Sequence, residues 1–508
     1  MDVVRHQVVT DLTVLISSTT PPSSCESGPR KWHRIEKDLY IHKSQQSAWL
    51  YVELAPEAEL KPEDLLVIDI RVGDPPPKSS SWESRLGGIW VLRSTFSCRN
   101  DKSVTEVDVL FGMDAVDPRP QWALTSLSLQ LDGQPTGLAP RLSVLRDRVM
   151  PKPDDRPTLR VREGGTFKIV QISDTHMVTG VGECNDAIGA HGEYLRTSEA
   201  DPLTVNFIGE ILDVEKPDLV VLTGDQVHHD IPDTQSALFK VVAPIIKRSI
   251  PFAAVFGNHD SEGTHALSRE EQMSILQNLP FSLCEPGPEH VDGIGNFCLQ
   301  VLAPEPSQTP VADLYFLDSH GEISSEIRKP DYDPIKQSQI DWFTDISHAQ
   351  RLAREKDNSD NAFHLSLVFQ HIPLPEFGDP RLSIHNGHRG EPSESPSCNT
   401  HFYDALAKAG VSALGCGHDH VNDFCALLSQ QTPQNDGKPP QSGPWLCYGG
   451  GSGFGGYCSY GEKRYYRGAR VWELGPSDGS LVTWRRVEYG AGRVDELVLV
   501  GSGVVVNP

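Results

Sequence analysis

The sequence predicts an α/β protein whose main region is preceded by an all-β domain. From residue 165 to 488, short apolar runs alternate with segments of helical periodicity, which is typical of strand-helix-strand folds. From residue 31 to 150, short β-type runs are instead separated by Pro, Gly and Ser turns, which is typical of a compact antiparallel domain. At 508 residues the chain is also too long for one ordinary domain.

Five segments are expected along the chain. Residues 1–30 are rich in Ser, Thr and Pro and predict a flexible N-terminal segment. Residues 31–150 predict a β-rich accessory domain, and the prolines of 151–164 predict a linker because they block helix and central strand alike. Residues 165–488 predict the α/β domain, and residues 489–508 form a C-terminal tail without a clear pattern.

The accessory domain shows no polar cluster of catalytic type, so a packing or partner-binding role is expected for it. Its candidate strands alternate in hydrophobicity and are bounded by turn residues. They cover residues 38–42, 48–54, 65–72, 88–96, 105–111 and 124–131.

The elements of the α/β domain follow from apolar runs and helix caps. Asp201 is expected to cap a helix with Pro202 in its first turn, and Ser268 with Glu271 forms a capping box for a second helix. Two further strands are expected at 470–474 and 481–487. Five apolar runs predict buried strands at residues 167–172, 218–223, 252–256, 365–369 and 411–416.

Each of these five strands is followed at once by potential metal ligands. Carboxylates, imidazoles and amide oxygens suit divalent cations, and ligands in α/β proteins bind beyond the carboxyl ends of strands. Any one of these motifs alone is more often an ordinary turn or core residue, but the five together in this order predict a single site. The candidate ligands are Asp174, His176, Asp225, Asn258, His371, His418 and His420.

The number of candidate ligands is sufficient for two adjacent metal ions. Asp225 is expected to bridge them, with Asp174, His176 and His420 on one ion and with the remaining ligands on the other. A hydroxide between two such ions is suited to in-line attack on phosphorus.

Four other residues are candidates for roles beside the metals. His259 is expected to protonate the leaving group, with Asp260 or a neighbour orienting it. His228 and Arg389 are candidate substrate contacts. The alternatives are an exposed loop histidine at 228 and a solvated polar insertion around 389, and these are equally supported.

The motif set resembles the calcineurin-like metallophosphoesterase superfamily, and most of all the fungal and plant purple-acid-phosphatase-like proteins. The resemblance covers about residues 166–474. The N-terminal sequence around Trp82 and at residues 111–117 is similar to the fungal members alone. The resemblance to this superfamily implies a two-sheet α/β sandwich, a dinuclear metal centre and hydrolysis of phosphoesters. The shared sequence segments lie at residues 216–225, 371–377, 417–425 and 447–451.

The chain departs from true purple acid phosphatases at two positions. His176 stands where they have glycine, and His228 stands where they have the tyrosine ligand of ferric iron. The coloured ferric site is therefore not expected, and the resemblance leaves Fe, Mn or Zn open, as two divalent or mixed-valence ions.

The expected function is that of a phosphomonoesterase acting on a phosphorylated protein or small molecule. Two alternatives remain open. One is a phosphodiesterase acting on nucleotides or cyclic nucleotides. The other is a catalytically silent, phosphoprotein-binding regulatory module.

The composition of the chain limits which classes of binding partner and which cellular compartment are expected. A net charge of −24 and a pI near 5.2 argue against nucleic acid and anionic membranes as partners. The absence of a spanning apolar stretch, a convincing signal peptide and an Asn-x-Ser/Thr sequon favours an intracellular protein. The 10 cysteines include no Cys-x-x-Cys pair and are expected to be free.

A glycine-rich stretch formally matches a dinucleotide-binding motif. Gly451, Gly453 and Gly456 have the required spacing, but the text after them is turn-like where that motif needs a helix. We expect instead a close-packed loop beside the metal site.

Overall fold

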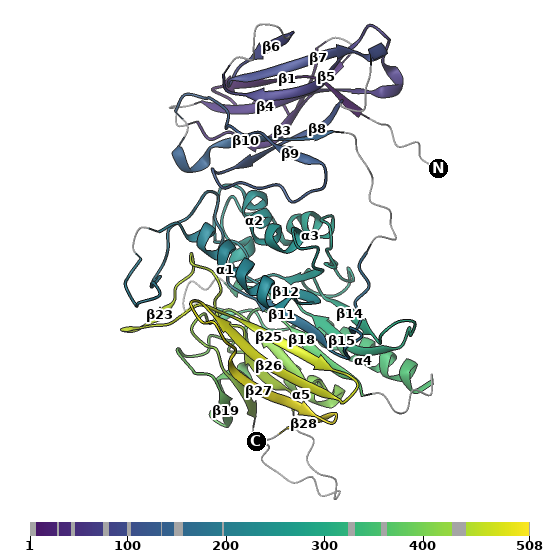
Figure 1. The fold of residues 1–508 in the computed structure, drawn as a ribbon, viewed down its shortest axis with the longest axis vertical. Coiled ribbons are helices and arrows are strands. Elements are labelled where there is room, and N and C mark those ends of the chain that lie inside the picture. The colour runs from purple at the N-terminus through teal and green to yellow at the C-terminus, as the bar shows by residue number, and fades with distance from the viewer. Residues whose placement is uncertain are drawn as a thin grey trace, which may run out of the picture. The chain divides into compact units, whose positions relative to one another are not determined.

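The structure is a computed structural model, and it describes residues 7–27, 30–41, 46–74, 81–98, 103–133, 135–146, 156–195, 198–323, 331–356, 363–428 and 443–506. The chain divides into two compact units (Figure 1). The first comprises Met1–Asp155 with Thr179–Val181 and Gln235–Ala243, and the second comprises the rest. No helix in the described ranges combines the length and apolarity needed to cross a bilayer.

The strands up to residue 146 form three antiparallel sheets around one core, as expected for an all-β domain. One sheet has the order β1 (Gln7–Ser17), β4 (Ser47–Pro56), β3 (Arg30–Asp38), β2 (Ser24–Ser27). A second has the order β5 (Leu65–Val72), β7 (Ile89–Thr95), β6 (Trp82–Arg85). The third has the order β8 (Val104–Phe111), β10 (Pro140–Arg146), β9 (Trp122–Leu124).

The prediction of a flexible segment over residues 1–30 is wrong for the part that the structure describes. Strand β1 pairs with β4 along its length and buries Val8, Val9 and Leu12. Asp11, which interrupts the apolar run in the sequence, lies at a register shift and forms an ion pair with Arg85 at 2.8 Å. The polar residue therefore marks a bulge in a strand and not a disordered tail.

Two candidate strands of this unit also have different bounds. The strand predicted at 38–42 overlaps β3 (Arg30–Asp38) only at Asp38; residues 39–41 are irregular, and residue 42 lies outside the described residues. The strand predicted at 124–131 is shorter and earlier, at Trp122–Leu124, and residues 125–131 are irregular.

The second unit contains two seven-stranded mixed sheets. In the first sheet the neighbouring strands β11, β12 and β13 are parallel, and the later strands are antiparallel. Its order is β13 (Phe252–Val255), β12 (Leu219–Thr223), β11 (Phe167–Ile172), β25 (Gly468–Gly475), β26 (Ser480–Val487), β27 (Val494–Gly501), β28 (Val504–Val505).

The second sheet is parallel at its centre, where β15, β18, β20 and β22 run together. Its order is β14 (Phe297–Leu302), β15 (Pro310–Phe316), β18 (Leu365–Phe369), β20 (Ala413–Cys416), β22 (Trp445–Tyr448), β21 (Cys425–Leu428), β19 (Leu382–Asn386). Two short hairpin pairs complete the strands, β16 (Glu322–Ile323) with β17 (Asp331–Tyr332) and β23 (Ser459–Tyr460) with β24 (Lys463–Arg464).

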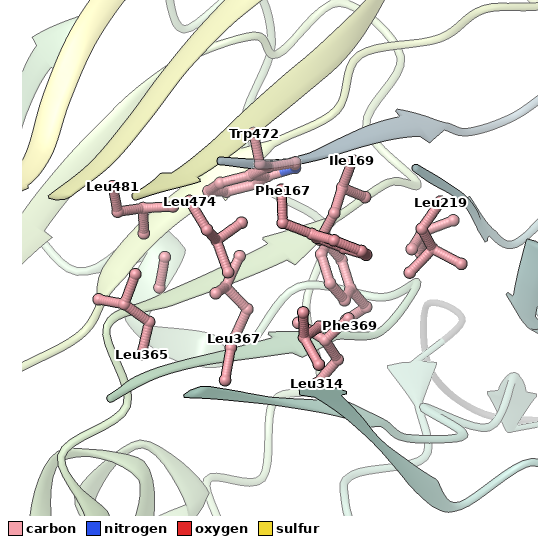
Figure 2. Close-up of a cluster of buried hydrophobic side chains, with 14 of the residues drawn as sticks. Phe167, Ile169, Leu219, Leu314, Leu365, Leu367, Phe369, Trp472, Leu474 and Leu481 are labelled. Carbon is pink, nitrogen blue, oxygen red and sulfur yellow. The ribbon is translucent and has the colours of Figure 1, made fainter. Parts of the chain in front are cut away.

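The two large sheets pack face to face, which confirms the two-sheet α/β sandwich. Along the strands, residues that face the other sheet alternate with residues on the outer face. The inward-facing residues of both sheets form one hydrophobic core. Figure 2 shows Phe167, Trp472 and Leu474 of the first sheet opposite Leu367 and Phe369 of the second. The rings of Phe369 and Trp472 meet edge to face with centroids 6.0 Å apart.

Five α-helices are described. They are α1 (Ala200–Glu215), α2 (Thr234–Ile246), α3 (Arg269–Gln277), α4 (Gln337–Lys356) and α5 (Phe402–Ala409). Helix α1 lies against β11 in the second unit (Figure 1), whereas Phe343 of α4 and Leu406 of α5 pack on the outer face of the other sheet.

One of the two predicted helix caps is confirmed. The capping box of Ser268 and Glu271 opens α3 as predicted. Asp201, however, is not the cap of α1: it lies in the first turn, where its carboxylate accepts the backbone N–H of Val178 at 3.0 Å.

Three other expectations need correction. The described part of the predicted tail, 489–506, is not separate, because β27 extends the first sheet and buries Leu499 and Val500 in its core. The described part of the predicted linker, 156–164, contributes Leu159 and Val161 to the same core, whereas 151–155 lie outside the described residues. The expectation that the cysteines are free is wrong for one pair, since Cys425 and Cys447 face each other on β21 and β22 and form a disulfide.

Candidate metal centre

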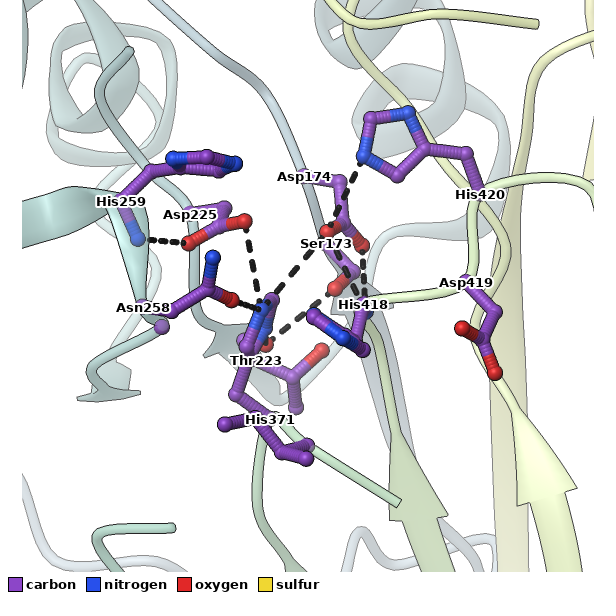
Figure 3. A network of polar contacts seen from close by, with 12 residues as sticks. Ser173, Asp174, Thr223, Asp225, Asn258, His259, His371, His418, Asp419 and His420 are labelled. Atoms are coloured by element: carbon purple, nitrogen blue, oxygen red, sulfur yellow. Dashed lines mark hydrogen bonds and ion pairs between the residues drawn. The ribbon is translucent and has the colours of Figure 1, made fainter. Parts of the chain in front are cut away.

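The seven candidate ligands come from the ends of five strands in both sheets of the second unit. Asp174 and His176 follow β11, Asp225 follows β12, and Asn258 follows β13 in the first sheet. The second sheet contributes His371 after β18, with His418 and His420 after β20. Figure 3 shows the side chains of Asp174, Asp225, Asn258, His371, His418 and His420 converging at the carboxyl edges of the strands.

Asp174, His176 and His420 form the first group of ligand atoms. The Nε2 atoms of His176 and His420 lie 3.1 Å apart, and Nε2 of His420 lies 3.4 Å from Oδ1 of Asp174. These donor atoms are buried and close enough to share one cation.

Asp225, His371 and His418 form the second group, with Asn258 beside it. Nε2 of His371 lies 3.2 Å from Oδ1 of Asn258 and 3.3 Å from Oδ2 of Asp225. The same Oδ2 atom lies 3.7 Å from Nε2 of His176 in the first group. Asp225, a member of the second group, therefore also faces the first group.

Backbone carbonyls orient two of the imidazoles. Nδ1 of His371 donates to the carbonyl oxygen of Thr223 at 2.8 Å, and Nδ1 of His420 donates to that of Tyr457 at 2.9 Å. A carbonyl can only accept, so the proton of each neutral ring is on Nδ1 and Nε2 is left with a free lone pair. The Tyr457 ring also stacks on His420 with centroids 4.0 Å apart.

The chemistry of the donors fits metal ions. Nε2 of His418 is buried without a hydrogen-bond partner among the described residues, which is unusual unless a ligand satisfies it. Burial lowers the pKa of His418 to about 3, and burial followed by His420 lowers the pKa of His176. Both rings are therefore neutral, which is the form that binds metals.

The two carboxylates of the centre remain ionised although they are fully buried. Burial opposes ionisation, but His420 lowers the pKa of Asp174 and His371 lowers that of Asp225. The carboxylates in turn outweigh burial at His371 and raise its pKa to about 9. Two buried anions this close require nearby positive charge, which the imidazoles provide here and bound cations would also provide.

Unusual backbone conformations hold several ligands in place. Asp174, His176, Asp225 and His418 all have positive φ angles, of 54°, 46°, 50° and 76°. This left-handed region is costly for residues with a Cβ and is concentrated at functional sites.

Glycines allow the ligand loops to approach one another. A Cβ at Gly456 would lie 2.5 Å from Cε1 of His420 and 2.9 Å from Cδ2 of His176. A Cβ at Gly453 would overlap the backbone of Thr175. The glycine-rich stretch is thus the predicted close-packed loop beside the ligands.

The side chains of His259 and Asp260 have different partners in the structure. The backbone N–H of His259 donates to Oδ1 of Asp225 at 2.9 Å, and its ring faces Glu262, with Nδ1 2.5 Å from Oε2. Asp260 is buried and accepts backbone N–H groups of Gly257, Asp225 and Val227 at 2.7–3.0 Å. The neighbour that contacts the His259 ring is therefore Glu262, while Asp260 holds the ligand loops together.

Glu262 was missed because nothing in its local sequence distinguishes it from a solvated turn residue. Its side chain is 47% exposed, and it belongs to the loop that follows the short 3₁₀ turn η4 (His259–Ser261). The only signal in the sequence is its spacing of three residues from His259, which one 3₁₀ turn brings together.

The two candidate substrate contacts have different surroundings. Nδ1 of His228 lies 3.2 Å from Nδ1 of His176, so His228 adjoins the first ligand group. The Arg389 guanidinium donates to Ser393 and to the carbonyl oxygen of Phe377, and these partners lie outside the ligand cluster.

A cavity of about 610 Å³ adjoins the second ligand group through Asn258. Arg269 lines it and donates to the carbonyl oxygens of Gly257 and His320, both at 2.8 Å. This cavity was not predicted from the sequence, because its walls come from segments that lie far apart along the chain.

Known proteins share the part of the sequence that carries the candidate ligands. Residues 167–422 match the family described as calcineurin-like phosphoesterase, and this range contains all seven candidate ligands. Phosphatase DCR2 of Saccharomyces cerevisiae is 35% identical over 402 residues, which are 76% of this chain and 64% of that protein. The chain thus matches less than two thirds of the length of this relative.

Two further proteins extend the comparison. "Probable inactive purple acid phosphatase 29" of Arabidopsis thaliana is 36% identical over 336 residues, which are 63% of this chain and 80% of that protein. The crystal structure of a dimetal phosphatase from Danio rerio covers 66% of this chain and 99% of its own, at 15% identity and a TM-score of 0.40.

Proposed function

Because this chain belongs to the calcineurin-like phosphoesterase family, we propose that it is a metal-dependent phosphatase that hydrolyses phosphomonoesters at the seven-ligand centre. One observation carries the proposal. The Asp225 carboxylate lies within 3.7 Å of an imidazole of each ligand group, an arrangement suited to two adjacent ions.

Each ligand has a proposed place. Asp174, His176 and His420 would hold one ion, Asn258, His371 and His418 the other, and Asp225 would contact both. Two bound divalent ions would acidify a water molecule and neutralise the charge of the phosphoryl oxygens. Fe, Mn and Zn all accept such nitrogen and oxygen ligands.

His259 is proposed as the general acid. Its Nδ1 faces Glu262, so the carboxylate orients the ring and leaves Nε2 free to face the departing oxygen. Its backbone N–H binds Asp225, which fixes its place relative to the ligands. Asp260 acts as a positioning residue through the backbone of Asp225. His228 and Arg389 stay candidate substrate contacts.

A silent phosphoprotein-binding module is the second candidate, since the name of the Arabidopsis relative describes that protein as probably inactive. A silent module needs the metal ligands but not the proton donor. Here His259 and its partner Glu262 are present together, which favours turnover.

The test is hydrolysis of a simple aryl phosphate by the purified chain with added Mn²⁺, paired with elemental analysis. The wild-type protein should bind two metal ions and turn over. Asp225→Asn should lose metal and activity together, because the shared carboxylate loses its charge. Asp213→Asn, on an exposed carboxylate of α1, should retain both.

Two outcomes would contradict the proposal. A metal-loaded wild type that hydrolyses no monoester, diester or phosphopeptide would be a silent module. Faster hydrolysis of nucleotide diesters than of monoesters would identify a phosphodiesterase.

A further inference from the structure

A third group of potential metal ligands lies outside the seven-ligand centre. His229, His259 and Glu262 each offer one ligand atom, and these atoms all lie within 4.8 Å of one another. His229 and Glu262 are exposed and His259 is half-buried, whereas six of the seven candidate ligands are buried. Cations in solution can therefore reach this group directly.

Two loops that are bonded to each other carry the three side chains. The backbone N–H of Asp230 donates to the carbonyl oxygen of Glu262 at 2.9 Å. The Asp230 carboxylate accepts the backbone N–H groups of Thr264 at 2.9 Å and His265 at 3.2 Å. His229 thus belongs to a loop held in register with Glu262 before any ligand binds.

Close backbone approach reinforces this arrangement. Gly263 has φ +104°, and a Cβ there would lie 2.5 Å from Cβ of Asp230. Only glycine permits the two loops to meet at this point. The ring of His229 lies 5.4 Å from that of His259, centroid to centroid, so small side-chain rotations would direct both toward one cation.

We propose that His229, His259 and Glu262 form a third, solvent-facing site for a divalent cation such as Zn²⁺, and that its occupation inhibits the enzyme. Two imidazoles and one glutamate, with an open position for water, are a known protein ligand set for zinc. None of the three is among the seven ligands of the buried centre.

Inhibition follows from the position of His259 and rests on the proposed function. A cation at this site would bind the His259 ring together with the Glu262 carboxylate that contacts it. The ring would then be held by the cation and would no longer be free to act on the leaving oxygen. Binding of the cation does not depend on the proposed function.

The first experiment counts metal ions. The full chain is loaded with Zn²⁺ alone and dialysed against rising Zn²⁺, and bound zinc per chain is measured by elemental analysis. Wild type should take up a third equivalent after the first two. His229→Ala and His229→Gln should retain two and bind the third at least about tenfold more weakly, since even outer-shell changes cost that much.

His348→Ala is the matched control, because His348 is exposed on α4 and outside all three ligand groups. It should bind the third equivalent like wild type. The two retained equivalents in each variant also report that the fold is intact. Equal third-site binding in wild type and His229→Ala, or no third equivalent in wild type, would overturn the site.

The second experiment measures hydrolysis of the aryl phosphate over the same Zn²⁺ range. Excess zinc should slow wild type and His348→Ala, while His229→Ala should keep its rate. Inhibition that persists in His229→Ala after loss of the third equivalent would refute the inhibitory role alone. If no protein hydrolyses any phosphoester, the proposed function fails while the zinc count still tests the site.

Discussion

His371 and His420 each donate Nδ1–H to a backbone carbonyl, and this leaves Nε2 of both rings directed at the carboxylates of the centre. When these rings are neutral, as metal binding requires, the backbone therefore sets their tautomers. Burial keeps His176 and His418 neutral at the same time. At the scale of single residues, backbone carbonyls that are not themselves candidate ligands orient the imidazoles for cation binding.

Replacing the proposed acid should separate metal binding from catalysis. His259→Ala should retain two metal ions and lose about a hundredfold or more in kcat, the usual scale for general acid catalysis. Metal content and kcat are measured together, with His401→Ala on an exposed side chain as the control. If His259→Ala instead lost the buried metals, His259 would be a ligand and its proposed role would be wrong.

A carboxylate in the β domain should make that unit sensitive to acid. Hydrogen bonds from Arg93, then Arg85, lower the pKa of Glu83 from 4.5 to about 2, against the effect of burial. A lowered folded-state pKa stabilises the fold above pH 4.5, and this stabilisation is lost as the pH falls from 4.5 to 2. Because the pair is partly exposed, the contribution should be about 1 kcal/mol or less.

Urea unfolding at pH 7 and pH 3 tests this expectation. Glu83→Gln should lower the free energy of unfolding at pH 7 and reduce its loss on acidification. Glu59→Gln, at an exposed glutamate of the 3₁₀ turn η1 (Glu57–Glu59), should change neither. An unchanged acid response in Glu83→Gln would show that other groups dominate it.

At the scale of elements, the centre depends on strand ends that continue directly into left-handed turns. Asp174 follows β11 and Asp225 follows β12, and these strands are parallel neighbours, so their carboxyl ends lie together. Such turns leave little room for added atoms. A Cβ at Gly224, where φ is +92°, would overlap the ring of His371 from the opposite sheet.

Gly224→Ala should therefore disrupt the centre from a residue that binds no metal. The added methyl group should displace His371 and strain the turn, with a loss of metal and of roughly 1–3 kcal/mol of stability. Elemental analysis and thermal unfolding measure both effects. Gly164→Ala, where a Cβ would meet nothing within 4 Å, should leave both unchanged. Normal metal content in Gly224→Ala would mean that the turn can accommodate the added methyl group without displacing His371.

At the scale of the whole molecule, the chain has a net charge of −24 and buries two carboxylates in its centre. Bound cations should therefore stabilise the folded chain in addition to any role in catalysis. The seven ligands come from both sheets of the sandwich, so the metals would tie the sheets together.

Chelation should lower the melting temperature of the second unit. Metal at about 100 times its Kd adds about 2.7 kcal/mol to the free energy of unfolding. Calorimetry with added Mn²⁺ and with EDTA should show this shift in wild type and none in Asp225→Asn. An equal shift in both proteins would place the stabilising ion elsewhere.

The local sequence determined much of this protein. Five apolar runs, each followed by Asp, His or Asn, predicted five strands and the seven side chains that converge at their ends, because strand periodicity and turn chemistry are local properties. Where a local signal was ambiguous, prediction failed. Asp11 made β1 look like a broken run, although the bulge and Arg85 accommodate its charge.

Only the tertiary structure decided which of these residues meet. The five strands divide between two sheets, so His371 reaches Asn258 across the sandwich, from 113 positions away in the chain. Glu262, and not Asp260, meets the His259 ring because one backbone turn places it there. Periodicity specifies which face of a strand is buried, but contacts between distant segments depend on how the sheets pack.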